Sequence, residues 1–303
     1  MKLYRFAAID IGSNAVRLLF SNVVEDGINV SFKKSSLLRV PLRLGEDSFS
    51  LGKLTPKKID KFVDTMKAFS LLMKVHDVVA FRACATSAMR EASNSKEIVA
   101  RVKKETGIEI EVIDGKEEAE IIYANQIVEL IDDDSHYLYV DVGGGSTEVT
   151  LFGSRKLIDS HSFDIGTLRI LSGNVSKADF DEMKEWVKKV ITTKKEINLI
   201  GSGGNINKLY KLSGKKENQP LLYDELNEIH KFIMYYSLDE RIKVLGLNPD
   251  RADVIIPAAD IYLKIMKWSG AKKIIVPTIG VSDGIIHLLY QQFKRRKKRI
   301  ITL

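Results

Sequence analysis

The stretch YVDVGGGSTEVTLF, residues 139–152, decides how the rest of the chain is understood. An apolar run ends at Asp141, three glycines and two hydroxyl residues follow, and Glu148 opens a second apolar run. The two runs predict strands, and the glycines between them predict a tight turn. Because glycine has no Cβ, the backbone N–H groups of such a turn can point at an anion. We therefore predict a phosphate-binding hairpin with carboxylates beside it.

The same plan occurs earlier, in AAIDIGSNAVRLLF at residues 7–20, where Asp10 matches Asp141. A third glycine turn, GSGGN, covers residues 201–205. The repeat predicts two similar domains whose glycine turns face a shared cleft. The side chain of Arg17 either faces the phosphates or points to solvent. The remaining expected phosphate-binding residues are Gly12, Ser13, Asn14, Gly143, Gly144, Gly145, Ser146, Thr147, Gly203 and Gly204.

Three carboxylates, those of Asp10, Asp141 and Glu148, flank these turns. Carboxylates and phosphate oxygens repel one another unless a cation lies between them. Mg²⁺ is usually bound by one or two carboxylates together with phosphate oxygens and water. We therefore expect the three carboxylates to be Mg²⁺ ligands. The simpler alternative is that Asp141 and Glu148 only cap the turn.

Strand and helix patterns alternate along the chain, which predicts an α/β fold with mixed sheets flanked by helices. The clearest helix follows Thr55, an N-cap residue, and Pro56 at its first position. The predicted domains cover residues 1–124 and 125–283. Apolar residues at helical spacing over 284–303 predict a last helix that can pack back onto the first domain and complete it.

Composition narrows the class of protein. Hydrophobic residues make up 45% and charged residues 29% of the 303 residues, as in ordinary globular proteins. No apolar run reaches the ~20 residues of a membrane span, and the first residues show no signal-peptide core. The only cysteine, Cys84, excludes an internal disulfide. We therefore predict a cytoplasmic protein without a membrane partner.

The net charge of +7 favours an anionic partner. Part of the excess lies in KRRKKR, Lys294 to Arg299, for which a solvated helix end is the simplest interpretation and a nucleic-acid or membrane patch the alternative. No recognised nucleic-acid module occurs, so no specific nucleic acid is expected as a partner. Five scattered histidines and the lack of a C-x-x-C motif argue against zinc.

Together the motifs of the chain resemble the exopolyphosphatase / guanosine pentaphosphate phosphohydrolase family of the actin-like ATPase and sugar-kinase superfamily. The motifs are AIDIGSNAVRLL, ATSAMREASN, VIDGKEEAEIIY, VDVGGGSTEVTLF, SFDIGTLRI, GSGGNINKL and RADVIIPAADIYLKIM. The resemblance covers nearly the whole chain. It implies two actin-like (ribonuclease H-like) domains facing an interdomain cleft. It also implies hydrolysis of the terminal phosphoanhydride of inorganic polyphosphate or guanosine pentaphosphate with water and Mg²⁺.

The resemblance assigns Glu118 as the catalytic base, which agrees with the need for a cleft carboxylate to deprotonate water. Arg90 matches the arginine that clamps the phosphate, and a guanidinium suits phosphate oxygens. Glu117 is assigned a structural role. From the residues alone, the helix dipole is the simpler explanation for acids in a first helical turn, and the resemblance reverses that preference for Glu118.

Three positions depart from the family pattern. Glu120 replaces the arginine of E-E-A-R, Ser282 and Asp283 stand where Arg-Glu is common, and the third turn begins Gly-Ser. Two positive charges are therefore missing, which bears on the affinity for long polyphosphate. The chain resembles short family members without the C-terminal helical domain, which are typically exopolyphosphatases that often prefer shorter polyphosphates.

These features predict an Mg²⁺-dependent exopolyphosphatase whose partner is polyphosphate. The alternative within the same chemistry is a phosphohydrolase of a phosphorylated guanosine nucleotide, guanosine pentaphosphate. A sugar-kinase-like phosphotransferase and a non-catalytic polyphosphate sensor are alternatives from other classes. The family also suggests a homodimer.

Overall fold

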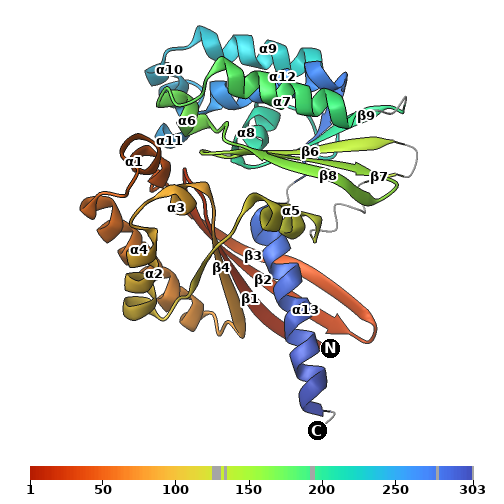
Figure 1. Cartoon of the computed structure of the whole chain (residues 1–303). Helices are drawn as coiled ribbons and strands as arrows, with labels where there is room; N and C mark the ends of the chain where they lie inside the picture. Colours follow the sequence, from red (N-terminus) through yellow and green to blue (C-terminus); the bar gives the residue numbers. More distant parts are fainter. Residues whose placement is uncertain (125–130, 133–134, 192–194, 278–279, 302–303) are drawn as a thin grey trace. The chain divides into compact units, whose positions relative to one another are not determined.

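The computed structural model describes residues 1–124, 131–132, 135–191, 195–277 and 280–301. The chain divides into two compact units, Met1–Asn125 with Gly280–Leu303, and Gln126–Ile279. Each unit contains one mixed sheet flanked by helices (Figure 1), which confirms the predicted fold class. Among the described residues, no helix is both long and apolar enough to cross a bilayer.

The first unit contains a five-stranded sheet in the order β3-β2-β1-β4-β5. The first three strands form an antiparallel meander, whereas β1, β4 and β5 run parallel. The carboxyl ends of these parallel strands therefore meet at one edge, the usual place for ligands in such sheets. The strands are β1 (Lys2–Ile11), β2 (Val16–Asp26), β3 (Asn29–Val40), β4 (Ala80–Ala85) and β5 (Ile110–Val112).

Two groups of helices flank this sheet. The first four pack their apolar residues onto one face, with Ile9, Leu18 and Phe62 in the core. The last helix lies along β1 (Figure 1), where the ring of Phe6 contacts the ring of Phe293 at 5.5 Å between centroids. The helices are α1 (Leu44–Leu51), α2 (Pro56–Val75), α3 (Ser87–Glu91), α4 (Ser95–Thr106), α5 (Gly115–Tyr123) and α13 (Val281–Ile301).

Helix α2 begins as predicted, with Thr55 as N-cap residue and Pro56 at the first position. The hydroxyl of Thr55 does not cap its own helix. It donates instead to Oδ2 of Asp47 at 2.6 Å, which ties α1 to α2. Helix α5 begins after Asp114, whose carboxylate accepts from the amide of Glu117 at 2.8 Å. The run KEEAEIIYANQIVELI, residues 116–131, predicts a longer helix, of which residues 125–130 lie outside the described residues.

The second unit contains a six-stranded sheet in the order β10-β11-β9-β6-β7-β8. Strands β6, β7 and β8 form an antiparallel meander, and β6, β9 and β11 run parallel. The arrangement repeats that of the first unit. The strands are β6 (His136–Val142), β7 (Thr147–Gly153), β8 (Lys156–Phe163), β9 (Ile197–Ser202), β10 (Leu221–Leu222) and β11 (Lys273–Ile275).

Helices cover one face of the second sheet, as Figure 1 shows for α7, α9 and α12. Leu138, Val140 and Val149 point into this core, while Tyr139, Asp141 and Glu148 alternate with them on the other face. The helices are α6 (Thr167–Leu171), α7 (Lys177–Val190), α8 (Gly204–Leu212), α9 (Tyr223–Tyr235), α10 (Leu238–Lys243), α11 (Pro249–Ala252) and α12 (Ile255–Ser269).

Candidate active site

The first glycine turn joins β1 to β2 and is closed by the amide of Gly12, which donates to the carbonyl of Ala15 at 3.2 Å. The hydroxyls of Ser13 and Ser87 lie 2.9 Å apart, and both residues are buried. Because Ser87 begins α3, this hydrogen bond fixes the turn against the helix that carries Arg90.

Arg17 lies directly opposite Asp10 in the β1–β2 register, and its Nη1 donates to Oδ2 of Asp10 at 2.7 Å. A Cβ added to Gly12 would lie 3.8 Å from Nη1 of Arg17. Of the two orientations open to Arg17, the structure therefore shows the one directed at the turn. The Asp10 carboxylate is 7% exposed and already has a cationic partner.

Two more predicted residues belong to the same edge of the first sheet. Helix α3 follows β4, and the segment before α5 follows β5, so both begin at the carboxyl ends of parallel strands. Nη1 of Arg90 donates to the carbonyl of Ile113 at 3.0 Å. The amide of Ile113 in turn donates to the carbonyl of Ala85, at the end of β4, at 2.9 Å. Arg90 is thus held beside the segment that leads to Glu118.

The structure separates the three glutamates of α5. Glu118 is 6% exposed and shares the inward face of the helix with Ile121 and Ile122. Oε1 of Glu117 accepts from Nη2 of Arg82 at 2.6 Å, an ion pair that explains its structural role. Glu120, which replaces the arginine of the family pattern, is exposed. Only Glu118 among them is placed inside the protein.

The second glycine turn joins β6 to β7 and has the same closing bond as the first. The amide of Gly143 donates to the carbonyl of Ser146 at 2.9 Å. Within the described part of the chain, no backbone carbonyl accepts from the amides of Gly144, Gly145 and Ser146. Buried amides normally have acceptors, so these three are suited to an anion.

The carbonyls of this turn face the start of α6. Gly143 accepts from the amide of Thr167 at 3.0 Å, and Gly144 accepts from the amide of Leu168 at 2.8 Å. A Cβ added to Gly166 would lie 2.3 Å from the carbonyl carbon of Gly145, so only glycine allows this approach. With its carbonyls engaged, the turn keeps its amides for a ligand.

Asp141 and Glu148 lie directly opposite each other on β6 and β7. Like charges in such a pair repel. Oε1 of Glu148 accepts from the hydroxyl of Ser162 at 2.9 Å. Burial, and then the negative charges of Asp141 and Glu148, raise the pKa of Tyr262 well above its usual range.

This carboxylate pair fits Mg²⁺, which usually takes one or two protein carboxylates and completes its shell with phosphate oxygens and water. Among the described residues, no group of three or more metal-ligating side chains occurs. Asp141 and Glu148 could supply two carboxylates to such an ion, whereas Asp10 is paired with Arg17.

The third glycine turn connects β9 to α8. Gly203 adopts φ of 100°, a conformation that favours glycine, and a Cβ there would lie 2.8 Å from Oδ1 of Asp141. Nη1 of Arg251 donates to the carbonyl of Gly204 at 2.6 Å. In the second unit, the third turn and the carboxylate pair are thus neighbours.

The departures from the family pattern at Ser282 and Asp283 lie at the start of α13. The carboxylate of Asp283 accepts from Lys34 and from the amide of Gly280, at 3.0 and 2.9 Å. Ser282 is buried. Of the basic run, Lys294 pairs with Glu25 at 2.8 Å, and side chains 296–299 lie outside the described residues.

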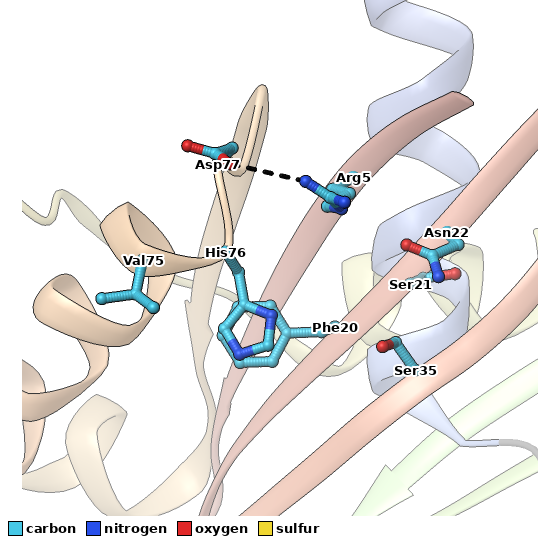
Figure 2. Close-up of a pocket in the computed structure, with 8 residues that line it drawn as sticks. All are labelled: Arg5, Phe20, Ser21, Asn22, Ser35, Val75, His76 and Asp77. Atoms are coloured by element: carbon cyan, nitrogen blue, oxygen red, sulfur yellow. Dashed lines mark hydrogen bonds and ion pairs between the residues drawn. The ribbon is translucent and has the colours of Figure 1, made fainter. Parts of the chain in front are cut away.

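A cavity of about 350 Å³ lies at the other end of the first sheet. In Figure 2 the ring of His76 stacks on Phe20, and Arg5 reaches toward Asp77. Arg5 precedes Asp10 by five residues of β1, or about 17 Å. The carbonyl end of α2 and the Asp77 carboxylate make this cavity unfavourable for phosphate.

The structure brings the predicted residues together within each unit. Asp10, the Gly12–Asn14 turn and Arg17 form one group, with Arg90 and Glu118 at the same edge of the sheet. In the second unit, the Gly143–Thr147 turn, Asp141, Glu148 and the Gly203–Gly204 turn form another. Three residues that contact the turns were not predicted: Ser87, Arg169 and Arg251. All three lie within the quoted motifs, which was the available signal.

Comparison with known proteins agrees with this arrangement. The model of the Ppx/GppA phosphatase family matches residues 23–293. An exopolyphosphatase structure from Cytophaga hutchinsonii superposes with a TM-score of 0.81 at 26% identity, covering 93% of this chain and 96% of that one. The Ppx/GppA structure from Aquifex aeolicus gives a TM-score of 0.77 at 25% identity, with 97% and 99% covered.

A bifunctional 3-dehydroquinate synthase/phosphatase from Fusobacterium nucleatum is 30% identical over 89% of this chain. The chain spans only 44% of the length of that relative. The chain belongs to the Ppx/GppA phosphatase family. Membership confirms the predicted family and enzyme class, that of hydrolases acting on phosphoanhydrides.

Proposed function

We propose that the protein is an Mg²⁺-dependent exopolyphosphatase that removes the terminal phosphate of inorganic polyphosphate. The observation that carries this proposal is the buried placement of Glu118 at the edge of the sheet that also presents the first glycine turn and Arg90. Membership of the Ppx/GppA family and the likeness to exopolyphosphatases support it.

In this proposal the amides of each hairpin turn bind phosphate oxygens of the substrate. Arg17 and Arg90 add positive charge, and guanidinium groups suit phosphate oxygens. Glu118 accepts a proton from a water molecule as that water attacks the terminal phosphorus. The anhydride bond to the next phosphate breaks, and orthophosphate and a polyphosphate shorter by one unit result.

Asp141 and Glu148 would hold Mg²⁺, with Asp10 as the third predicted ligand. When bound, the ion neutralises charge on the anhydride oxygens. The ion pair with Arg17 gives Asp10 a further role, because it holds the guanidinium over the turn.

Orthophosphate release from polyphosphates of defined length tests the proposal, with guanosine pentaphosphate as the competing substrate and with Mg²⁺ present or replaced by EDTA. We expect release from polyphosphate that needs Mg²⁺ and is faster than release from the nucleotide. Faster hydrolysis of guanosine pentaphosphate would change the substrate but keep the chemistry. Binding of polyphosphate without release over hours would instead indicate a sensor.

A further inference from the structure

The start of α6 holds the second glycine turn with a side chain as well as with backbone amides. Nε of Arg169 donates to the carbonyl of Gly145 at 2.8 Å, and Arg169 is only 9% exposed. Its Nη2 lies 3.5 Å from the carboxylate of Asp164, which is mostly exposed to water. Water screens such a pair strongly, so this ion pair is weak.

The first unit also holds its turn through backbone amides. The carbonyls of Ser13 and Asn14 accept from the amides of Gly45 and Arg43, both at 2.9 Å, just after the third strand of the sheet. The guanidinium of Arg43 pairs with Glu46 at 2.5 Å. The contact of the Arg169 guanidinium with a turn carbonyl is a feature of the second unit.

Charge balance gives a reason for this difference. In the first unit Arg17 lies opposite Asp10 and supplies positive charge to the turn. In the second unit the residue opposite the aspartate is Glu148, so the hairpin itself adds only negative charge. An anion bound there needs positive charge from another element, and Arg169 is a buried cation in contact with the turn.

We infer that Arg169 is a positioning residue for the anion site of the second turn, an inference that rests on the proposed phosphate chemistry. Its guanidinium fixes the Gly145 carbonyl toward α6, and because this carbonyl shares a peptide plane with the amide of Ser146, that amide is fixed in the direction of the anion. Its charge also lowers the electrostatic cost of an anion beside Asp141 and Glu148.

The test measures binding and turnover separately in the full chain. The dissociation constant of orthophosphate is measured by calorimetry, KM and kcat on short polyphosphate by phosphate release, and the fold by melting temperature. The variants are Arg169→Met, which keeps volume without donor or charge, Arg169→Gln, which keeps a donor, and Arg169→Lys, which keeps donor and charge. Arg241→Met is the control, because Arg241 donates only to carbonyls outside the glycine turns, those of Ile233 and Ala252.

We expect Arg169→Met to raise both the orthophosphate dissociation constant and KM by roughly 10- to 100-fold, the effect of losing a charged hydrogen bond. We expect kcat to change less, Arg169→Gln to be intermediate and Arg169→Lys to recover most of the affinity. Arg241→Met should lower the melting temperature but keep the affinity. If Arg169→Met does not fold, the Gln and Lys variants give the same ordering.

An orthophosphate affinity within twofold of wild type in Arg169→Met, or in Arg169→Gln if only that variant folds, would overturn the inference. A wild-type protein that binds no orthophosphate would overturn it as well. A wild-type protein that binds orthophosphate but releases none from polyphosphate would contradict the proposed function alone, and the binding series would still decide the role of Arg169.

Discussion

The two hairpins of the chain share a backbone and differ in charge. Both close with an amide donating across the turn, from Gly12 to Ala15 and from Gly143 to Ser146. In both, an aspartate precedes the turn by two residues. The residue opposite the aspartate is Arg17 in the first hairpin and Glu148 in the second.

This single difference changes what each hairpin can bind. The Asp10–Arg17 pair is nearly neutral and leaves a guanidinium over the turn, so the first hairpin favours an anion directly. The Asp141–Glu148 pair carries two negative charges and favours a cation, which can then accept phosphate oxygens. The first hairpin thus combines its turn with a positive charge, and the second combines a similar turn with a pair of carboxylates.

The largest effect is expected at a residue outside both hairpins. If the hairpins bind and Glu118 activates water, Glu118→Gln should lower kcat by roughly 10²- to 10⁴-fold with little change in KM, the scale of a general base. Steady-state phosphate release measures this. Glu117→Gln is the matched control on the same helix and should keep most activity, because it loses only the ion pair with Arg82. Equal losses in both variants would remove Glu118 from the proposed role.

Replacing the carboxylate of Glu148 by a guanidinium tests most directly whether the residue opposite the aspartate distinguishes the two hairpins. Glu148→Arg would give Asp141 a cationic neighbour, as Asp10 has. We expect the affinity for Mg²⁺ to fall at least 10- to 100-fold, the loss usual when only a supporting residue of a metal site is removed. Calorimetric titration with Mg²⁺ tests this, and Glu148→Gln should give a smaller loss. Unchanged Mg²⁺ affinity in Glu148→Arg would place the ion elsewhere.

Asp10→Asn tests the contribution of the first hairpin to Mg²⁺ and substrate binding. Because Asp10 is paired with Arg17, we expect a loss of Mg²⁺ affinity smaller than that of Glu148→Gln. We expect a rise in KM for polyphosphate of about tenfold, since a charge-assisted hydrogen bond that orients Arg17 is lost. Mg²⁺ titrations and KM measurements on Asp10→Asn and Glu148→Gln test these expectations. A larger Mg²⁺ effect than that of Glu148→Gln would make Asp10 the principal metal ligand.

The space around Gly12 and Gly166 should determine how strongly an added methyl group lowers the free energy of unfolding. At Gly166 an added Cβ would lie 2.3 Å from the second turn, whereas at Gly12 it would lie 3.2 Å from the carbonyl of Ala15. We expect Gly166→Ala to lower the free energy of unfolding by about 1–3 kcal/mol, as overpacking does, and Gly12→Ala by less. Urea denaturation of both variants measures the difference. Equal losses of unfolding free energy in the two variants would mean that the start of α6 shifts at little cost to accommodate the added methyl group.

Local patterns predicted much of the fold. The Thr55–Pro56 start of α2 and the strands of both hairpins follow from propensity and periodicity, which depend on neighbouring residues. Strand β8 and helix α1 were not predicted. Strand β8 is largely exposed, so its sequence lacks a clear apolar alternation.

The candidate site was predictable in its residues but not in its contacts. Helical spacing places Glu118 on the face of Ile121 and Ile122, so its burial follows from the sequence. The partner of Glu117 is Arg82, 35 residues earlier, and no local pattern connects them. The same is true of Ser87 with Ser13, and of Arg169 with Gly145.

The sequence by itself determined the α/β class, the repeated glycine turns and the carboxylates beside them, because each depends on residues a few positions apart. Only the tertiary structure decided that Arg17 faces Asp10, that Asp141 faces Glu148 and that α6 engages the carbonyls of the second turn. These facts depend on strand register and on the return of distant segments. Hydrogen bonds and charges act over a few ångströms in space, whatever the distance along the chain.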